Sequence, residues 1–417
     1  MLNSLNVYYN GWGESWLWGT LISSTATTGR PTIAFEYSPE AIQRGVQLSS
    51  YLLPLKGLPL RQGFPTYQMG LPGPVYDALP DGWGMLLMDR YFRKIGLHPA
   101  RIGPLERLTY ISTHATGALS FEPCVADMQT SENIPLPQSK KSSKEKVANF
   151  LQHLLVMGGS PQGARSKALV YRDPVNFEFS TQASDQNEAW LIKFPAQQEH
   201  PEVCAIEAVY AECLRLCAIE TPDTHFFNLP NGLMAFAAKR FDRQNGMRIP
   251  MQSLAAYTGA DYKVPGSLDY RNFLRATLMC TQDVRERLHT FKRAVFNVLF
   301  NNRDDHTKHF SFLMAKNGQW KLAPAYDVTF CEGLGGYDQM DIVEEALNIS
   351  RNDIHKLGTS EANLTTLEVD EIILAMREIA LQFSQIAQRL YPHQIRESTL
   401  EMIQSRIQQN IDFLTET

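Results

Sequence analysis

Cysteine is scarce in this chain, and the cysteines present form no recognisable framework. The six cysteines among the 417 residues are Cys124, Cys204, Cys213, Cys217, Cys280 and Cys331. None of them forms a Cys-x-x-Cys pair, which excludes a zinc ribbon and a dithiol redox motif. Free cysteines in this pattern are typical of reducing compartments, and we therefore expect an intracellular protein.

Targeting and membrane-spanning signals are also missing from the sequence. The first basic residue is Arg30, so the N-terminus lacks the positively charged region that opens a signal peptide. No apolar run approaches the length that is needed to cross a bilayer. We expect a cytoplasmic protein that does not act at a membrane.

Neither sign of charge dominates the composition. The chain has 39 Lys and Arg against 44 Asp and Glu, a net charge of −5, and a sequence pI of about 6.1. This balance argues against a broad surface for direct binding of nucleic acid. The hydrophobic fraction of 44% and the charged fraction of 20% are ordinary for a globular protein, and the length allows two or three domains.

What the chain does contain is a dense cluster of charged side chains in an otherwise apolar region. Asp304, His306 and Lys308 lie within five residues, directly after a long amphipathic run. Two short strand-like pieces follow, with a turn at Asn317-Gly318 between them, and Asp327 lies just past the second piece. A β-hairpin with an acid at each end would bring Asp304 and Asp327 together.

Two carboxylates at the mouth of such a hairpin suit metal–phosphate chemistry. One carboxylate can orient a nucleophile while the other holds Mg²⁺. A single Asp in this region could equally be a turn residue, because Asp favours turns through its own backbone chemistry. The crowding of two acids, an imidazole and a lysine favours a functional site.

Further groups of the kind that handle phosphates lie upstream. A glycine-rich loop at 157–164 precedes a strand, but Ala164 stands where a Walker A lysine would be, so it is not that kind of P-loop. Its backbone N–H groups could still lie over phosphates. Lys193 lies in a strand-like apolar run, and Glu207 lies in a predicted helix. Kinases use a strand lysine paired with a helix glutamate to hold the phosphates of ATP.

The order of these features indicates an α+β fold with a bilobal, protein-kinase-like arrangement. Strand-like segments dominate the first half of the chain, and helical spacing of apolar residues dominates beyond about residue 250. We therefore expect a strand-rich N-terminal lobe and an all-helical C-terminal lobe. The clearest strands are 7–9, 16–18 and 32–37, and the clearest helices are 285–300, 369–390 and 395–414.

Composition shifts along the chain suggest four segments. The first is a small β-rich subdomain, and the second is a polar, proline-containing linker. The third would be the N-lobe with the glycine-rich loop and the hinge, and the fourth the helical C-lobe with the catalytic segment. Their predicted bounds are 1–122, 123–146, 147–243 and 244–417.

Four motifs in this order resemble those of the HipA family, the serine/threonine kinase toxins of bacterial type II toxin–antitoxin pairs. They are residues 159–167, 239–243, 304–308 and 322–327, and the resemblance covers nearly the whole chain. It implies a kinase that uses ATP and Mg²⁺ to phosphorylate a translation component such as an aminoacyl-tRNA synthetase. It also implies a HipB-like helix-turn-helix antitoxin as partner, with DNA reached only through that antitoxin.

The resemblance also implies roles for individual residues. Asp304 matches the catalytic aspartate, Asp327 the metal-binding aspartate, and Lys193 the lysine that contacts the nucleotide phosphates. Ser160 matches a serine that is autophosphorylated, where phosphate would expel the loop and switch the kinase off. The residues expected at the nucleotide are Ser160, Gly163, Ala164, Lys167, Lys193, Glu207, Lys239, Arg240, Phe241, His306 and Tyr326.

One position departs from the family pattern. Five residues after Asp304, where the family has a metal-binding asparagine, this chain has His309. Mg²⁺ prefers oxygen ligands, whereas imidazole suits Mn²⁺ or Zn²⁺ better. His309 is therefore either a metal ligand that shifts the preference toward Mn²⁺, a mark of weakened activity, or a packing residue. The alternatives to a toxin kinase are a pseudokinase that acts as co-repressor and a small-molecule kinase.

Overall fold

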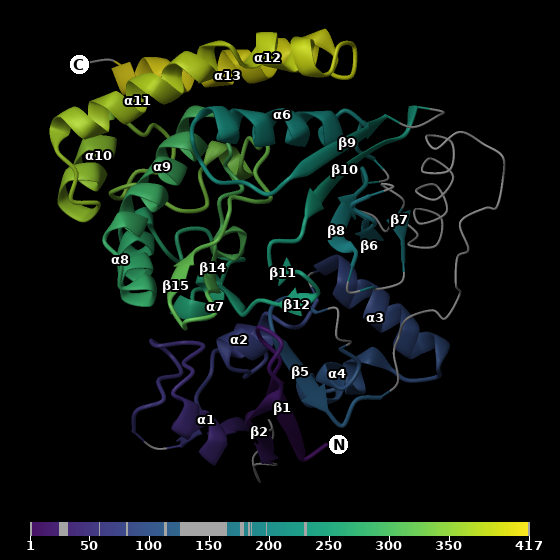
Figure 1. Cartoon of the computed structure of the whole chain (residues 1–417). Coiled ribbons are helices and arrows are strands. Elements are labelled where there is room, and N and C mark those ends of the chain that lie inside the picture. The colour runs from purple at the N-terminus through teal and green to yellow at the C-terminus, as the bar shows by residue number, and fades with distance from the viewer. Residues whose placement is uncertain are drawn as a thin grey trace. The chain divides into compact units, whose positions relative to one another are not determined.

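The computed structural model describes residues 2–24, 32–57, 59–80, 82–111, 115–125, 165–175, 179–181, 184, 186–196, 198–228 and 232–415. These residues form two compact units, each assembled from several segments of the chain (Figure 1). The first unit comprises Met1–Trp190, Arg240–Gly259 and Phe312–Trp320. The second unit comprises Leu191–Lys239, Ala260–Ser311 and Lys321–Thr417. The domain boundaries expected from composition stay predictions.

The first unit begins with a five-stranded antiparallel sheet. Val7, Trp18 and Phe35 are fully buried on one face of it, as the alternation of apolar residues predicts. Their strands confirm the three predicted N-terminal strands. The strand order is β4-β3-β2-β1-β5, with β1 at Ser4–Tyr9, β2 at Trp16–Ser24, β3 at Thr32–Tyr37, β4 at Leu60–Arg61 and β5 at Leu119–Glu122.

Short helices complete the first unit. Gly73 allows helix α2 (Gly73–Tyr76) to approach helix α7 (Leu254–Thr258) closely, because a Cβ at this position would lie 2.0 Å from the carbonyl oxygen of Ala256. Asp77 accepts hydrogen bonds from the backbone N–H and the hydroxyl of Ser253, the residue that caps the N-terminus of α7. The helices are α1 at Pro39–Arg44, η1 at Thr66–Gln68, α2 at Gly73–Tyr76, α3 at Gly82–Lys94, η2 at Pro99–Arg101, α4 at Pro104–Leu108 and α7 at Leu254–Thr258.

Three smaller strand pairings also involve the first unit. Strand β6 (Lys167–Arg172) pairs with β7 (Phe179–Ser180), and β11 (Arg243–Gln244) pairs with β12 (Met247–Arg248) around Asn245-Gly246. Both turn residues have positive φ, as a tight hairpin requires. A third sheet has the order β13-β14-β15, at Met251–Ser253, Ser311–Met314 and Trp320–Leu322. It contains the hairpin predicted after Asp304, so the C-terminal part of the chain is not helical throughout.

The second unit is mainly helical. Its strands are β8 at Glu188–Lys193, β9 at Thr224–Asn228 and β10 at Met234–Lys239, with β10 next to both of the others. Its α-helices are α6 at Val203–Leu216, α8 at Tyr270–Thr281, α9 at Arg285–Leu299, α10 at Arg351–Lys356, α11 at Thr366–Leu381, α12 at Phe383–Leu390 and α13 at Glu397–Thr415. Short turns η4 (Thr307–His309), η5 (Leu334–Gly336) and η6 (Leu357–Glu361) lie between them.

The long C-terminal helices pack in pairs. Helices α11 and α13 lie side by side in Figure 1 and are in contact, as are α8 and α9. The run predicted as one helix from 369 to 390 forms two helices, because Gln382 has φ −95° and ψ 4°, outside helical geometry. No helix among the described residues is long and apolar enough to span a bilayer.

Helix α6 is buried on nearly all sides, and Tyr210 lies at its centre. The Tyr210 ring meets Phe296, Phe300 and Phe383 edge-on, at centroid distances of 6.4, 6.2 and 5.3 Å. Its hydroxyl donates a hydrogen bond to the carbonyl of Phe300, the last residue before the predicted catalytic segment at 301–311. Burial raises the pKa of Tyr210 well above its usual value, so the hydroxyl stays protonated and donates.

Removing this hydroxyl should destabilise the second unit while the aromatic ring of the side chain keeps its shape. We expect Tyr210→Phe to lower the free energy of unfolding by about 1–2 kcal/mol, because a buried carbonyl would lose its donor. Denaturant unfolding followed by fluorescence measures this loss. Tyr337→Phe is the matched control, since the Tyr337 side chain is half exposed. Equal effects of the two substitutions would contradict the role given to Tyr210.

Candidate active site

A buried lysine holds two acids at the centre of the second unit. The Lys193 ammonium, at the end of β8, forms ion pairs with Glu207 Oε1 and with Asp327 Oδ1. Glu207 comes from α6, and Asp327 follows β15. The structure therefore brings together three residues that are far apart in the sequence.

Lys193 stays charged although it is buried, because these two carboxylates are its partners. Only 5% of the residue is exposed, and the loss of water around the ammonium lowers its pKa. The carboxylates of Asp327 and Glu207 outweigh this penalty, so the pKa of Lys193 is raised above its usual value. Lys193 thus remains a cation and could bind phosphate oxygens.

The catalytic segment begins where α9 ends. Asn301 takes a left-handed conformation with φ 53°, which Asn tolerates better than most residues. Asn302 forms a parallel bridge with Cys331, and the Cys331 N–H donates to the Asn301 carbonyl at 3.1 Å. The segment that follows Asp327 therefore lies beside the segment that precedes Asp304.

His309 links Asp304 to Asp327. Its Nδ1 lies 2.8 Å from the backbone carbonyl oxygen of Asp304, and its Nε2 lies 3.6 Å from Asp327 Oδ2. Because a carbonyl only accepts, Nδ1 carries the proton of the ring. In neutral His309 the lone pair is then on Nε2, which faces the Asp327 carboxylate.

His306 has the opposite arrangement. Its Nδ1 accepts a hydrogen bond from the Lys308 backbone N–H at 3.3 Å, which caps the short turn η4. The ring proton is therefore on Nε2, which lies 3.9 Å from Asp304 Oδ1. Burial, and then the neighbouring His309, lower the pKa of His306 to about 3, so the ring stays neutral. His306 braces the catalytic segment.

These groups fit a divalent cation. Ligand atoms of Asp304, His306 and His309 all lie within 4.8 Å of one another, but the proton on His306 Nε2 prevents that atom from binding a metal. The candidate ligands that remain are the Asp304 carboxylate and His309 Nε2, and Asp327 Oδ2 lies 3.6 Å from that nitrogen. One nitrogen among the oxygens makes this set less selective for Mg²⁺ than an all-oxygen site.

Two family models match the chain. One is described as the HipA N-terminal domain and matches residues 13–122. The other is described as the HipA-like C-terminal domain and matches residues 159–393, which is more than half of the chain. The chain belongs to the HipA family.

Solved structures support the same fold. HipA of Shewanella oneidensis MR-1, in a complex with HipB and its operator DNA, has a TM-score of 0.68 and 18% sequence identity, and the match covers 98% of this chain and 97% of that one. This likeness confirms the predicted α+β, protein-kinase-like fold. The proinflammatory kinase CtkA of Helicobacter pylori has a TM-score of 0.36 and 15% identity, over 54% of this chain and 88% of CtkA.

A curated relative shares part of the sequence. A Haemophilus influenzae protein named a putative kinase is 24% identical over 165 residues, which are 34% of this chain. The match spans 45% of that relative. The chain therefore aligns with less than half of the length of this protein.

Several residues expected at the nucleotide have other contacts in this HipA-family chain. The Tyr326 hydroxyl donates to the carbonyl of Lys308 at 2.8 Å and lies 2.6 Å from the Ser311 hydroxyl. Lys239 lies 3.8 Å from Asp223 in the second unit. Tyr326 therefore contributes to the shape of the catalytic segment.

Arg240, from the predicted hinge, takes part in an ion-pair network inside the first unit. Arg240 donates to both oxygens of Asp242, at 2.8 and 2.6 Å, and Arg243 donates to the same carboxylate. The Gly117 N–H adds a further hydrogen bond. Burial opposes ionisation of Asp242, but the two guanidinium groups hold its pKa well below the usual value. The Arg240 guanidinium is thus committed to Asp242.

The remaining predicted residues have these positions. Lys167 begins β6, and Phe241 follows Arg240 in the first unit. Ser160, Gly163 and Ala164, with the loop that carries them, lie outside the described residues.

The sequence did not indicate a pair of buried acids, Asp305 and Asp338, near Asp304. Asp305 accepts from the Tyr270 hydroxyl at 2.7 Å and from the Gln339 N–H at 2.8 Å. Burial raises the pKa of Asp305 to about 6. Burial and the charge of Asp305 raise the pKa of Asp338 well above its usual value. The adjacent Asp304-Asp305 pair was the available signal, but a sequence does not show which carboxylate faces inward.

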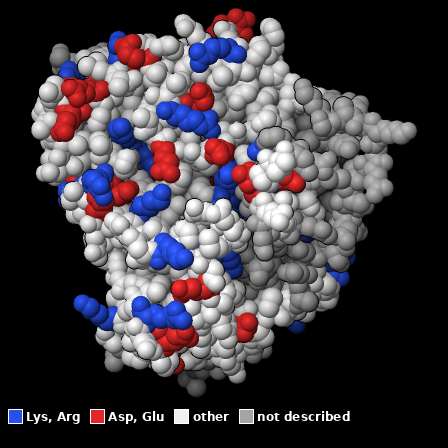
Figure 2. All heavy atoms as spheres, in the orientation of Figure 1, with Lys and Arg blue, Asp and Glu red and all other residues white. Residues whose placement is uncertain are grey.

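Charges on the surface agree with the balanced composition. Figure 2 shows basic and acidic side chains interleaved over the described residues of one face. This face gives no support to direct binding of nucleic acid over a broad surface.

The raised pKa of Asp305 predicts a pH dependence of stability. An acid with a raised pKa in the folded state favours folding below its unfolded pKa, and this contribution is lost as the pH rises from about 4 to about 6. Wild type should therefore lose stability relative to Asp305→Asn over this range. Thermal melts of both proteins between pH 4.5 and 7.5 measure the difference.

The control for this comparison is Glu371→Gln on the exposed side of α11. Its melting temperature relative to wild type should be the same across the range. A constant difference between wild type and Asp305→Asn would show that Asp305 does not titrate there.

Proposed function

We propose that this protein is a serine/threonine kinase toxin that depends on ATP and a divalent metal ion. The observation that carries the proposal is the buried Lys193, which is paired with Glu207 and Asp327. Asp304 lies nearby, because the His309 ring contacts both its backbone carbonyl and Asp327. In kinases a lysine of this kind contacts the nucleotide phosphates, and a glutamate holds that lysine in place. Membership of the HipA family supports the same reaction class.

Each residue then has one role in phosphoryl transfer. Bound ATP with its metal ion supplies the γ-phosphoryl group and neutralises the charge that develops during transfer. The Lys193 ammonium binds phosphate oxygens, and Glu207 keeps it in position. Asp304 orients the acceptor hydroxyl and takes its proton, and its side chain is 48% exposed and within reach of a substrate. Asp327 and His309 would hold the metal ion.

The proposed partners follow from the family. The Shewanella oneidensis HipA structure contains HipB and operator DNA, which supports a helix-turn-helix antitoxin as partner of this chain. Contact with DNA would occur through that antitoxin. The acceptor would be a cytoplasmic protein of translation, such as an aminoacyl-tRNA synthetase, and autophosphorylation at Ser160 would inhibit the kinase.

One observation favours a second function. His309 Nε2 faces Asp327 Oδ2 at 3.6 Å, and a protonated ring would pair with that carboxylate in place of a metal ion. The protein would then be a pseudokinase that binds the antitoxin as a co-repressor. The two functions differ in whether the protein transfers phosphate.

Incubation with γ-labelled ATP and either Mg²⁺ or Mn²⁺ tests the proposed function directly. We expect label on the protein itself, and we expect Asp304→Ala to abolish it because no group would then accept the hydroxyl proton. Ser160→Ala should remove the label if that serine is the acceptor. The intact mass of the purified protein shows whether phosphate was already present. Nucleotide binding without transfer, in protein that starts unphosphorylated, would favour the pseudokinase.

The metal preference should depend on His309. We expect His309→Asn to raise the ratio of the Mg²⁺-supported rate to the Mn²⁺-supported rate by about tenfold, because an amide oxygen is a harder ligand than imidazole. Binding of Mn²⁺, followed by its electron paramagnetic resonance signal, should weaken in parallel. His393→Asn is the control, since His393 is exposed. An unchanged preference would make His309 a packing residue.

A further inference from the structure

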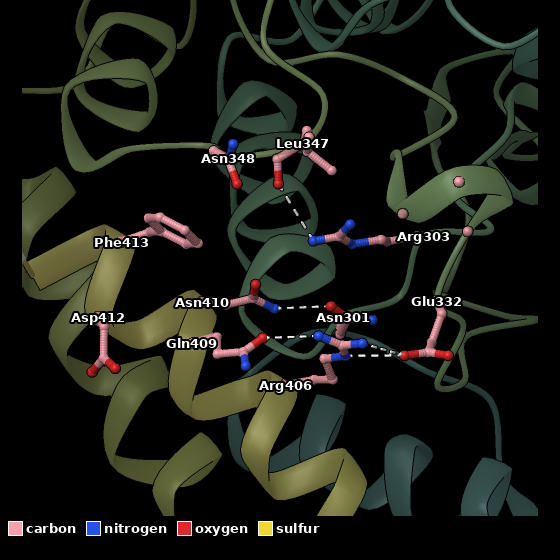
Figure 3. Close-up of a pocket in the computed structure, with 13 residues that line it drawn as sticks. Asn301, Arg303, Glu332, Leu347, Asn348, Arg406, Gln409, Asn410, Asp412 and Phe413 are labelled. Carbon is pink, nitrogen blue, oxygen red and sulfur yellow. Dashed lines mark hydrogen bonds and ion pairs between the residues drawn. The ribbon is translucent and has the colours of Figure 1, made fainter.

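A cavity in the second unit is lined by residues that the proposed reaction does not use. Its volume is about 640 Å³, within the range of sites that bind small molecules. Figure 3 shows its walls: α13 on one side, Asn301 and Arg303 on another, and the stretch from Glu332 to Asn348 around the rest.

Arg303 brings a poorly compensated positive charge into this cavity. Its side chain is only 15% exposed, and its Nε lies 3.9 Å from Asp338 Oδ2. Its Nη2 reaches the carbonyl oxygen of Leu347 at 3.5 Å. Both contacts are long for a guanidinium, which normally forms short paired hydrogen bonds with an anion. The raised pKa of Asp338 weakens this partner further.

The other charged groups around the cavity are better satisfied. Arg406 binds Glu332 with its Nε at 2.9 Å and contacts Gln409 at 3.1 Å. Asp412 accepts from the Gln408 amide at 2.8 Å, and Figure 3 shows its carboxylate pointing away from the cavity. Arg303 is therefore the group best placed to bind an added anion.

Glycines keep the wall beside Arg303 open. Gly333 and Gly336 have φ of 69° and 84°, which favour glycine. A Cβ at Gly336 would lie 3.5 Å from Arg303 Nη1, and a Cβ at Gly333 would lie 3.0 Å from Arg303 Cβ. Side chains at these positions would fill the space around the arginine.

The opposite wall is aromatic. Phe413 is 40% exposed, and Figure 3 shows its ring pointing into the cavity from the side opposite Arg303. An exposed aromatic ring favours a ligand with an apolar or flat body. The buried amide of Asn410 lies between the two walls and is fixed by Asn301 Oδ1 at 3.2 Å.

We propose that this cavity binds a small organic anion, with its phosphate or carboxylate on the Arg303 guanidinium and its apolar body on Phe413. A guanidinium suits a phosphate monoester or a carboxylate because its fork matches two acceptor oxygens. The site is separate from the proposed phosphotransfer chemistry, so it stands or falls independently of it.

Phenyl phosphate is the probe that matches both walls. Calorimetric titration of the full chain should show that it binds about tenfold or more tightly than inorganic phosphate, which lacks the ring, or benzyl alcohol, which lacks the charge. Arg303→Met should weaken phenyl phosphate binding by about tenfold or more. Phe413→Ala should weaken it to the level of inorganic phosphate, whose own binding should not change.

Three variants complete the test. Arg389→Met removes an exposed arginine on α12 and should bind the probe like wild type. Lys193→Met that circular dichroism shows to be folded should also bind it unchanged, and a loss in the folded variant would place the probe at the nucleotide site and overturn the proposal. Arg303→Lys keeps the charge without the fork, so it should bind between wild type and Arg303→Met even if the latter folds poorly. Equal binding of phenyl phosphate and benzyl alcohol by wild type would also overturn the proposal.

Discussion

The second unit depends on the buried ammonium of Lys193. A lysine with this little exposure is costly unless opposite charges and hydrogen bonds replace the water that it loses. Glu207 and Asp327 supply them, and each comes from a different element. The requirement to compensate one charge therefore fixes the end of β8, helix α6 and the loop after β15 relative to one another. The proposed phosphate-binding group, Lys193, and the proposed metal-binding group, Asp327, are thus positioned by the same constraint.

Three consecutive residues near the Lys193 ion pairs have different surroundings. Arg303 points toward the cavity under α13, Asp304 presents an exposed carboxylate, and Asp305 is buried against Tyr270 and the backbone of Gln339. The buried member anchors the segment, so that its neighbour can be held at the surface in one position. Catalytic groups require this kind of support, because a small misplacement costs much of the rate.

The sequence predicts the parts of this site better than their contacts. Lys193 and Glu207 follow from a strand and a helix in the right order, and the hairpin follows from its Asn-Gly turn. The nucleotide contact expected of Arg240 stays a prediction, and the sequence does not show that its guanidinium pairs with Asp242. Asp305 looks like any second acid in a turn. The direction in which a side chain points depends on residues far away in the chain, and the periodicity of apolar residues does not reveal these contacts.

Under the proposed function, the imidazole of His309 would take the place of the asparagine that the family pattern leads one to expect. Its Nδ1–H holds the Asp304 carbonyl, which fixes the ring and leaves the Nε2 lone pair toward Asp327. An asparagine would offer its donor and acceptor on one short amide, whereas the imidazole separates them across a ring. The histidine therefore combines a backbone anchor with a nitrogen that faces Asp327. Under the proposed kinase function that nitrogen would be a metal ligand, whereas under the co-repressor function the same contact would be an ion pair with Asp327, so the metal dependence of phosphate transfer separates the two functions.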